Sequence, residues 1–158
     1  MPRLVVKATR RGINNATKRL QPEELYIIAK SSLTETLAYL KDIVVANTPR
    51  NTGQTAEGIY TEVNGTSIKD LHGIVTSKDA SFSILEYGRT PGGRMPPPEP
   101  IEQWAMAHGI DPDKVFPIQR AIARRGLPAL HIMENALKQA PQHFKVVYLK
   151  KWMDAWGP

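Results

Sequence analysis

Residues 22–46 constrain the fold most, because this stretch is long and repeats its small and apolar side chains at helical spacing. Those side chains recur three and four residues apart: Leu25, Ile28, Ser32, Leu33, Thr36, Leu40, Ile43 and Val44. Pro22 suits the first position of a helix, and Glu23 and Glu24 follow where the helix dipole favours acids. Pro49 lies just beyond the expected end. The sequence therefore predicts one long helix as the largest element.

Three strands are predicted after this helix. Residues 57–64 alternate between two faces, as a strand does. The dipeptide Asn64-Gly65 is typical of a tight hairpin turn. Residues 67–77 and 80–87 have the composition of two further strands, so we expect a small antiparallel meander.

The most unusual composition is that of residues 88–100 (GRTPGGRMPPPEP). Three glycines and five prolines in this stretch exclude a regular element. We expect a long loop that projects from the edge of the sheet. Proline lowers the entropy that a loop loses on docking, so the loop is a candidate interface element.

Four helices are expected in the remaining sequence, over residues 99–108, 112–124, 128–139 and 142–156. The order of elements is then one long helix, a small antiparallel sheet of about three to four strands, and C-terminal helices. This order indicates the α+β class. A chain of 158 residues has the size of one domain, which we expect over residues 22–158.

The net charge of +6 belongs to the N-terminal arm, residues 1–21, which we expect to be flexible. The arm contains no acidic residue and six basic ones: Arg3, Lys7, Arg10, Arg11, Lys18 and Arg19. One interpretation is a solvated tail that aids solubility. The other is non-specific contact with phosphates or with an acidic protein surface, since no sequence-reading motif accompanies the charges.

A search for catalytic or metal-binding motifs finds little. The chain has no cysteine, no nucleophile elbow and no phosphate-binding glycine motif. Of the four histidines (His72, His108, His131 and His143), His131 lies three residues before the acid Glu134 on a predicted helix, and one such pair is too few ligands for a metal. Glu86 beside Tyr87 could be imagined as a general acid, but no polar partner is evident. We expect no enzyme activity and no cofactor.

Membrane insertion and secretion are not expected from the sequence. No apolar run approaches the length of a membrane span, and the N-terminus lacks a secretory pattern, so we expect a chain that is made and used in a cytoplasm. Tyr148, Trp152 and Trp156 lie four residues apart on the last predicted helix. They are interpreted either as core residues or as a subunit interface, with a membrane-surface role disfavoured because the stripe is short.

Four stretches, in order, resemble the small tail-component family of lambdoid siphophages, whose members are neck, head–tail joining or tail-completion proteins. They are TPRNTG at 48–53 with Ile59 after it, ILEYGRT at 84–90, PPP at 96–98 with Trp104 after it, and AIARRGLP within residues 118–133. The second is similar to the family's V-E-Y-G-T signature, and the fourth to its I-A-R-x-I-x-x-x-G-T-x-P-x-P-F run. The resemblance covers roughly residues 22–138.

The resemblance implies a virion protein that assembles in the host cytoplasm into a homo-oligomeric ring, often sixfold, around a channel that DNA crosses. Expected partners are neighbouring copies, head-closure or neck proteins, and tail-terminator or tail-tube proteins. The basic arm would then face the DNA or an acidic patch. The loop would form the interface through Glu86, Tyr87, Gly88, Arg89, Pro91, Gly92, Gly93, Arg94, Pro96, Pro97 and Pro98. Alternatives are the tail terminator itself, a non-specific nucleic-acid-binding module and, least favoured, an enzyme.

Overall fold

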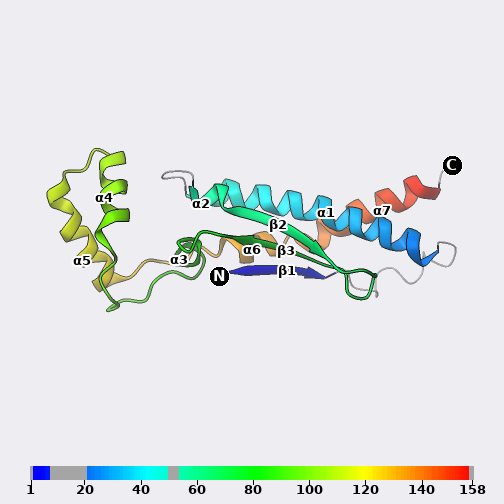
Figure 1. Cartoon of the computed structure of the whole chain (residues 1–158), viewed down its shortest axis with the longest axis horizontal. Coiled ribbons are helices and arrows are strands. Elements are labelled where there is room, and N and C mark those ends of the chain that lie inside the picture. The colour runs from blue at the N-terminus through cyan, green and yellow to red at the C-terminus, as the bar shows by residue number, and fades with distance from the viewer. Residues whose placement is uncertain (1, 8–20, 50–53, 157–158) are drawn as a thin grey trace.

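The computed structural model describes residues 2–7, 21–49 and 54–156 of the chain. The chain belongs to the α+β class, as predicted (Figure 1). In chain order its elements are β1 (Arg3–Lys7), α1 (Pro22–Asn47), α2 (Gln54–Glu57), β2 (Ile59–Asn64), β3 (His72–Ser77), α3 (Phe82–Tyr87), α4 (Pro98–Ala107), η2 (Pro112–Lys114), α5 (Val115–Arg125), α6 (Ile132–Leu137) and α7 (Ala140–Trp156).

The long predicted helix is confirmed as α1, which ends one residue later than expected. Pro22 occupies its first turn, where a missing N–H leaves no helical bond unmade. The carboxylate of Glu24 accepts a hydrogen bond from the N–H of Gln21 at 2.9 Å and so caps the start. Pro49 follows Asn47 and Thr48 and cannot continue the helix.

The sheet has the strand order β1-β3-β2, with both pairings antiparallel. Strands β2 and β3 confirm two of the three strands that were predicted between residues 57 and 87. The third prediction, a strand over residues 80–87, is wrong, because these residues form helix α3. The remaining strand of the sheet is β1, from the predicted arm, in which Val5 pairs with Ile74 of β3.

Strand β3 begins at His72 and not at residue 67, because the preceding residues form a turn around Asp70. The Asp70 carboxylate accepts the Oγ–H and N–H of Ser67 at 2.5 and 2.7 Å, and the N–H of Thr66 at 3.0 Å. These bonds, that from the Ser67 hydroxyl first, hold the pKa of the Asp70 carboxyl well below its ordinary value. A charged Asp70 therefore holds the turn between β2 and β3.

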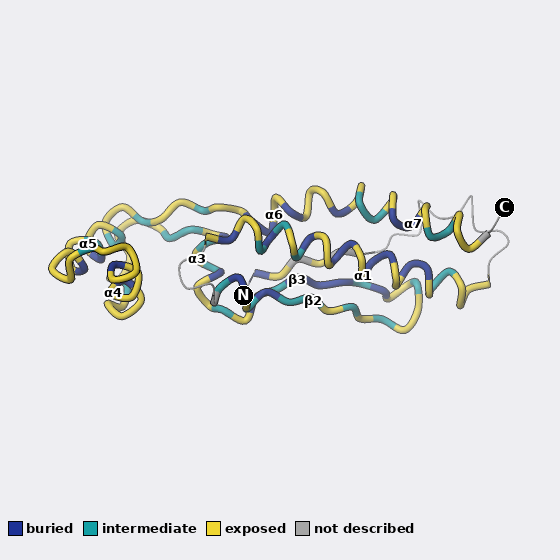
Figure 2. Tube along the Cα trace, turned by 90° about the horizontal axis from the view of Figure 1, so that it is seen from above, coloured by how far each residue is buried: buried dark blue, intermediate teal, exposed yellow. Residues whose placement is uncertain are grey.

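Helix α1 lies at the centre of the main core, with the sheet on one side and α7 on another (Figures 1 and 2). Residues on its sheet-facing side are fully buried, among them Leu33, Leu37 and Leu40. Gly73 of β3 lies directly beneath Leu37, where a Cβ atom would come within 2.5 Å of a leucine methyl group. Burial on two sides explains why the apolar and small residues of α1 spread beyond a single narrow stripe.

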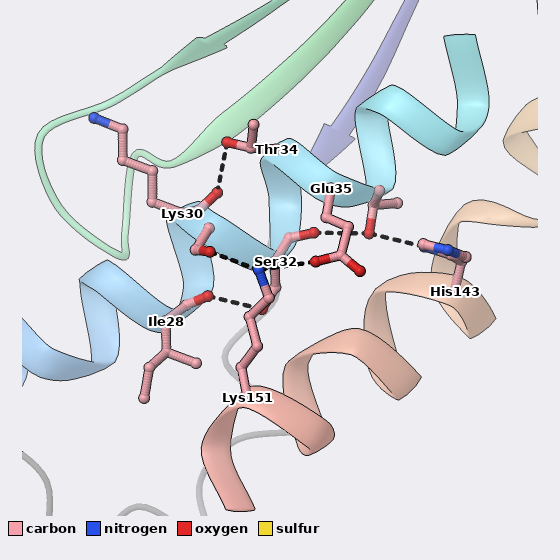
Figure 3. Close-up of polar contacts among 9 residues, drawn as sticks. Ile28, Lys30, Ser32, Thr34, Glu35, His143 and Lys151 are labelled. Atoms are coloured by element: carbon pink, nitrogen blue, oxygen red, sulfur yellow. Dashed lines mark hydrogen bonds and ion pairs between the residues drawn. The ribbon is translucent and has the colours of Figure 1, made fainter. Parts of the chain in front are cut away.

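Small polar residues of α1 form its contact with α7 (Figure 3). The buried hydroxyls of Ser32 and Thr36 donate to main-chain carbonyls one turn earlier, at 2.7 and 2.9 Å, so neither is left unsatisfied. Nδ1 of His143 lies 3.2 Å from the Thr36 hydroxyl. At the edge of the contact, Lys151 Nζ lies 2.9 Å from a carboxylate oxygen of Glu35. Short buried polar side chains of α1 therefore take part in this contact, beside the stacked rings of Tyr39 and His143, with an ion pair at the rim.

A second hydrophobic cluster lies in α4, η2 and α5, which we call the head unit (residues 98–125). Its buried centre consists of Ile101, Ala105 and Val115. Figures 1 and 2 place the head unit at one end of the molecule, away from the sheet and from α1, α3, α6 and α7, which we together call the body. The predicted helices 99–108 and 112–124 are confirmed here, with a 3-10 turn in front of the second.

The helix predicted over residues 128–139 is wrong in its first part, because α6 begins only at Ile132. Residues 128–131 form neither helix nor strand. His131 has a left-handed backbone with φ of 51°, which breaks the chain direction immediately before α6. The predicted last helix, 142–156, is confirmed as α7, which starts two residues earlier.

Candidate functional site

Two of the sequence motifs, Glu86-Tyr87-Gly88-Arg89 and Arg125-Gly126-Leu127-Pro128, meet in space and join the head unit to the body. Arg89 and Leu127 pair as an antiparallel bridge, each N–H donating to the other's carbonyl oxygen at 2.9 Å. We call this pair of segments, residues 88–97 and 126–131, the stalk. The chain therefore enters and leaves the head unit at one place, which the sequence alone did not indicate.

The two glycines of the stalk are required by its geometry. Gly88 and Gly126 have φ of 72° and 73°, which only glycine adopts without strain. A Cβ on Gly126 would lie 2.1 Å from the Arg89 carbonyl oxygen, and one on Gly88 would lie 2.6 Å from that of Leu127. Each glycine thus lets one segment approach the backbone of the other.

Glu86, a predicted interface residue, is buried inside the body and is 4% exposed. Its two carboxylate oxygens accept main-chain N–H groups at the start of α6, from Met133 at 2.8 Å and from Glu134 at 3.1 Å. Both are among the N–H groups that lack a partner within a helix's first turn. Glu86 therefore fastens α3 to α6. Its oxygens are engaged in this bond, which argues against the general-acid role considered above.

The proline-rich loop lies against α5, and its predicted projection from the sheet edge is wrong. It follows helix α3, and its residues 98–100 belong to α4. The N–H of Gly92 donates to the Ala123 carbonyl at 2.8 Å, and the buried Gln119 side chain donates to the Pro96 carbonyl at 2.8 Å. The Arg89 guanidinium donates to the carbonyl of Arg94.

The predicted interface residues of this loop divide into two groups. The main chain of Gly88, Arg89, Gly92 and Pro96 is used within the molecule. Other side chains remain exposed, and they belong to Tyr87, Pro91, Arg94, Pro97 and Pro98. Only the second group offers side chains to a partner.

Large apolar side chains are exposed on the head unit, and sequence reasoning did not single them out. Met106 of α4 is 66% exposed and Phe116 of α5 is 59% exposed. Met95 in the stalk and Trp104 are also partly open to solvent. Exposed apolar residues gathered on one unit are typical of a contact surface.

The C-terminal aromatic residues serve mainly within the chain. Tyr148 is 6% exposed and belongs to the main core, where burial raises the pKa of its hydroxyl. Trp152 is half-buried against the same core. The side chain of Trp156 lies outside the described residues. The exposed apolar residues of α7 are instead Val146, Leu149 and Met153, three and four positions apart.

Most of the predicted basic arm, including Arg10, Arg11, Lys18 and Arg19, lies outside the described residues. Residues 3–7 form β1, the strand beside β3. The exposed Arg3 lines an open hollow of about 230 Å³ with Tyr87 and Glu134. The start of the arm and the start of the stalk therefore lie at one place on the body.

Metal and membrane sites were considered within the described residues. His131 Nδ1 lies 3.1 Å from Oε2 of Glu134, and Lys138 Nζ lies 3.3 Å from Oε1 of the same carboxylate, so the predicted pair exists as an exposed side-chain contact. Residues 2–7, 21–49 and 54–156 contain no cluster of three or more residues able to hold a metal. No helix among these residues is both long enough and apolar enough to cross a membrane.

Comparison with known proteins gives no further guide to the role of this site. No protein-family model, no curated protein and no solved structure matches the chain.

Proposed function

We propose that the chain is a structural subunit of a tailed bacteriophage, a neck or tail-completion protein that joins tail to head. The observation that most supports this proposal is that the second and fourth stretches of the resemblance pair with each other in the stalk. Glu86, Gly88 and Arg89 come from the second, and Gly126 and Leu127 from the fourth. Motifs that are distant in the sequence but build one structure support the resemblance more than the same motifs taken separately.

The distribution of polar and apolar groups also favours an assembly role over catalysis. Glu86, the acid considered for catalysis, accepts hydrogen bonds from two main-chain N–H groups of α6. The head unit instead presents Met106 and Phe116 to solvent at the end of a stalk. A surface of this kind is suited to contact with another protein.

In this proposal the chain forms a homo-oligomeric ring around the channel for DNA, sixfold by the resemblance. Its neighbours would be head-closure or neck proteins on one side and tail-terminator or tail-tube proteins on the other. The basic arm would face the DNA or an acidic patch on an adjacent ring. The protein would assemble in the host cytoplasm and remain in the virion.

Deletion of the gene in the phage that encodes it tests this proposal. The lysate should contain DNA-filled heads and complete tails that do not join, as seen by electron microscopy, and the wild-type chain supplied from a plasmid should restore joined particles. Tails of excessive length would identify the chain as the tail terminator. Full infectivity of the deletion phage, with the chain absent from purified particles, would refute a virion role.

A further inference from the structure

We infer that the outer face of α4 docks onto the outer face of α7 in a second copy of the same chain. This inference names the surfaces through which the proposed ring would form, but it is argued from the two faces alone, since self-association of this kind does not require a phage. The two faces match in chemistry, and they lie at opposite ends of one molecule (Figures 1 and 2).

The face on α4 combines an apolar side chain with two acids. Glu99, Glu102 and Met106 are all exposed and follow one another at spacings of three and four, so they share one side of the helix. Ile101 and Ala105, on the other side, are buried in the head unit. The α4 face is therefore acidic, with Met106 as its apolar anchor.

The face on α7 combines an apolar stripe with two bases. Val146, Leu149 and Met153 are 55%, 41% and 58% exposed. At the 100° per residue of a helix, the exposed Lys145 and Lys150 lie on either side of this stripe. Lys151, by contrast, turns toward α1 and binds Glu35 (Figure 3). The α7 face therefore offers apolar area between two exposed lysines, which complements the α4 face in charge.

Charge also decides which side of the head unit docks. The outer face of α5 carries Phe116 with Arg120 and Arg124, and so would be repelled by the lysines of α7. The α4 face has the opposite sign. The direction of the contact therefore follows from the charges.

The contact has to form between molecules. Both views place the head unit beyond the stalk at one end of the body, while α7 runs toward the other end. A surface and its complement on one chain give a heterologous contact, which repeats from copy to copy and closes into a ring if the rotation allows. One chain thus supplies both halves of the interface.

Charge reversal with rescue, followed by sedimentation velocity of the full chain over a concentration series, tests the inference. The wild type should self-associate. Glu99→Lys with Glu102→Lys, or Lys145→Glu with Lys150→Glu, should each weaken association by about tenfold, since two attractive pairs become repulsive. The four-residue variant should restore it. Because Glu99 lies in the first turn of α4, the neutral pair Glu99→Gln and Glu102→Gln provides a milder version, expected to weaken association less.

The matched control replaces Arg120 and Arg124 by glutamine on α5, which removes two charges from the other face of the same head unit without making that face acidic. Association should be unaffected, and circular dichroism should match the wild type for every variant. A wild type that stays monomeric at all concentrations would overturn the inference. So would a four-residue variant that does not associate, or a control that loses association as the α4 variant does. If the chain self-associates with charge rescue but is absent from virions, the proposed function is refuted and the α4–α7 contact is not.

Discussion

The replacement Glu86→Gln tests the most specific structural role that the molecule assigns to a single side chain. Both oxygens of Glu86 accept main-chain N–H groups from α6, at 2.8 and 3.1 Å, and the residue is 4% exposed. Glutamine retains one acceptor oxygen and turns an NH₂ group toward the other N–H. The Met133 N–H is the more buried of the two, so the amide oxygen should bind it and leave the Glu134 N–H unpaired.

The expected loss follows from these contacts. A hydrogen bond to a charged acceptor contributes about 1.5–3 kcal/mol, and an unsatisfied buried N–H costs about 1–3 kcal/mol. We therefore expect Glu86→Gln to lower the free energy of unfolding by about 2 kcal/mol. Glu86→Ala, which removes both acceptors, should lower it by about 4 kcal/mol. Domains of this size have about 5–15 kcal/mol in total, so both variants should still fold.

Urea denaturation followed by circular dichroism, at one protein concentration, measures these changes. Glu62→Gln provides the matched control, because Glu62 is an exposed glutamate on β2, and it should change stability by no more than about 0.5 kcal/mol. Hydrogen exchange at the main-chain N–H groups of residues 133 and 134 should accelerate in the Glu86 variants. If Glu86→Gln proved as stable as Glu62→Gln, the carboxylate would not be what fastens α3 to α6.

Two further changes test the stalk and the turn between β2 and β3. Gly92→Ala should lower the free energy of unfolding by about 1 kcal/mol, since the φ of Gly92 is positive but an added Cβ would meet no other atom. Gly126→Ala should lower it by about 3 kcal/mol or more, because an added Cβ would also meet the Arg89 carbonyl oxygen. Equal losses for the two variants in urea titrations would count against the close approach of the two segments at Gly126. The pKa of Asp70 is lowered in the folded chain, so its charge stabilises the fold above the ordinary aspartate pKa of about 4, and this contribution disappears as the pH falls through the lowered value. The stability advantage of the wild type over Asp70→Asn should therefore shrink in acid, and an advantage that grew as the pH fell would contradict this assignment.

Local patterns in the sequence predicted the elements that depend on local signals. Helix α1 combines a long periodic stretch with Pro22 at its start and Pro49 beyond its end, and it was placed to within one residue. The prediction failed over residues 80–87, where a short apolar run suits either a strand or a helix. Two signals for the helix were present. The Asp79 carboxylate accepts the N–H of Ser81 before α3, and Gly88 ends it with a positive φ.

Long-range contacts could not be predicted from one sequence. Strand β1 pairs with β3 across some seventy residues, and nothing in Leu4, Val5 and Val6 names that partner. The loop over residues 88–100 was correctly interpreted as irregular up to residue 97, but its attachment to α5 depends on Gln119, a polar residue inside a helix. Sequence reasoning assigned Glu86 to an interface. Its partners are instead main-chain N–H groups nearly fifty residues away, and no pattern of side chains in the sequence indicates such a contact.

The pairing of Arg89 with Leu127 makes the intervening segment a self-contained insert. Its two ends are joined by the hydrogen bonds between Arg89 and Leu127. Its buried residues Ile101, Ala105 and Val115 pack on one another and not on the sheet. A tight turn could close the gap between those ends without moving α3 or α6. Evolution, or an engineer, could thus exchange this tip for another of different length or specificity while the remainder of the chain kept its architecture.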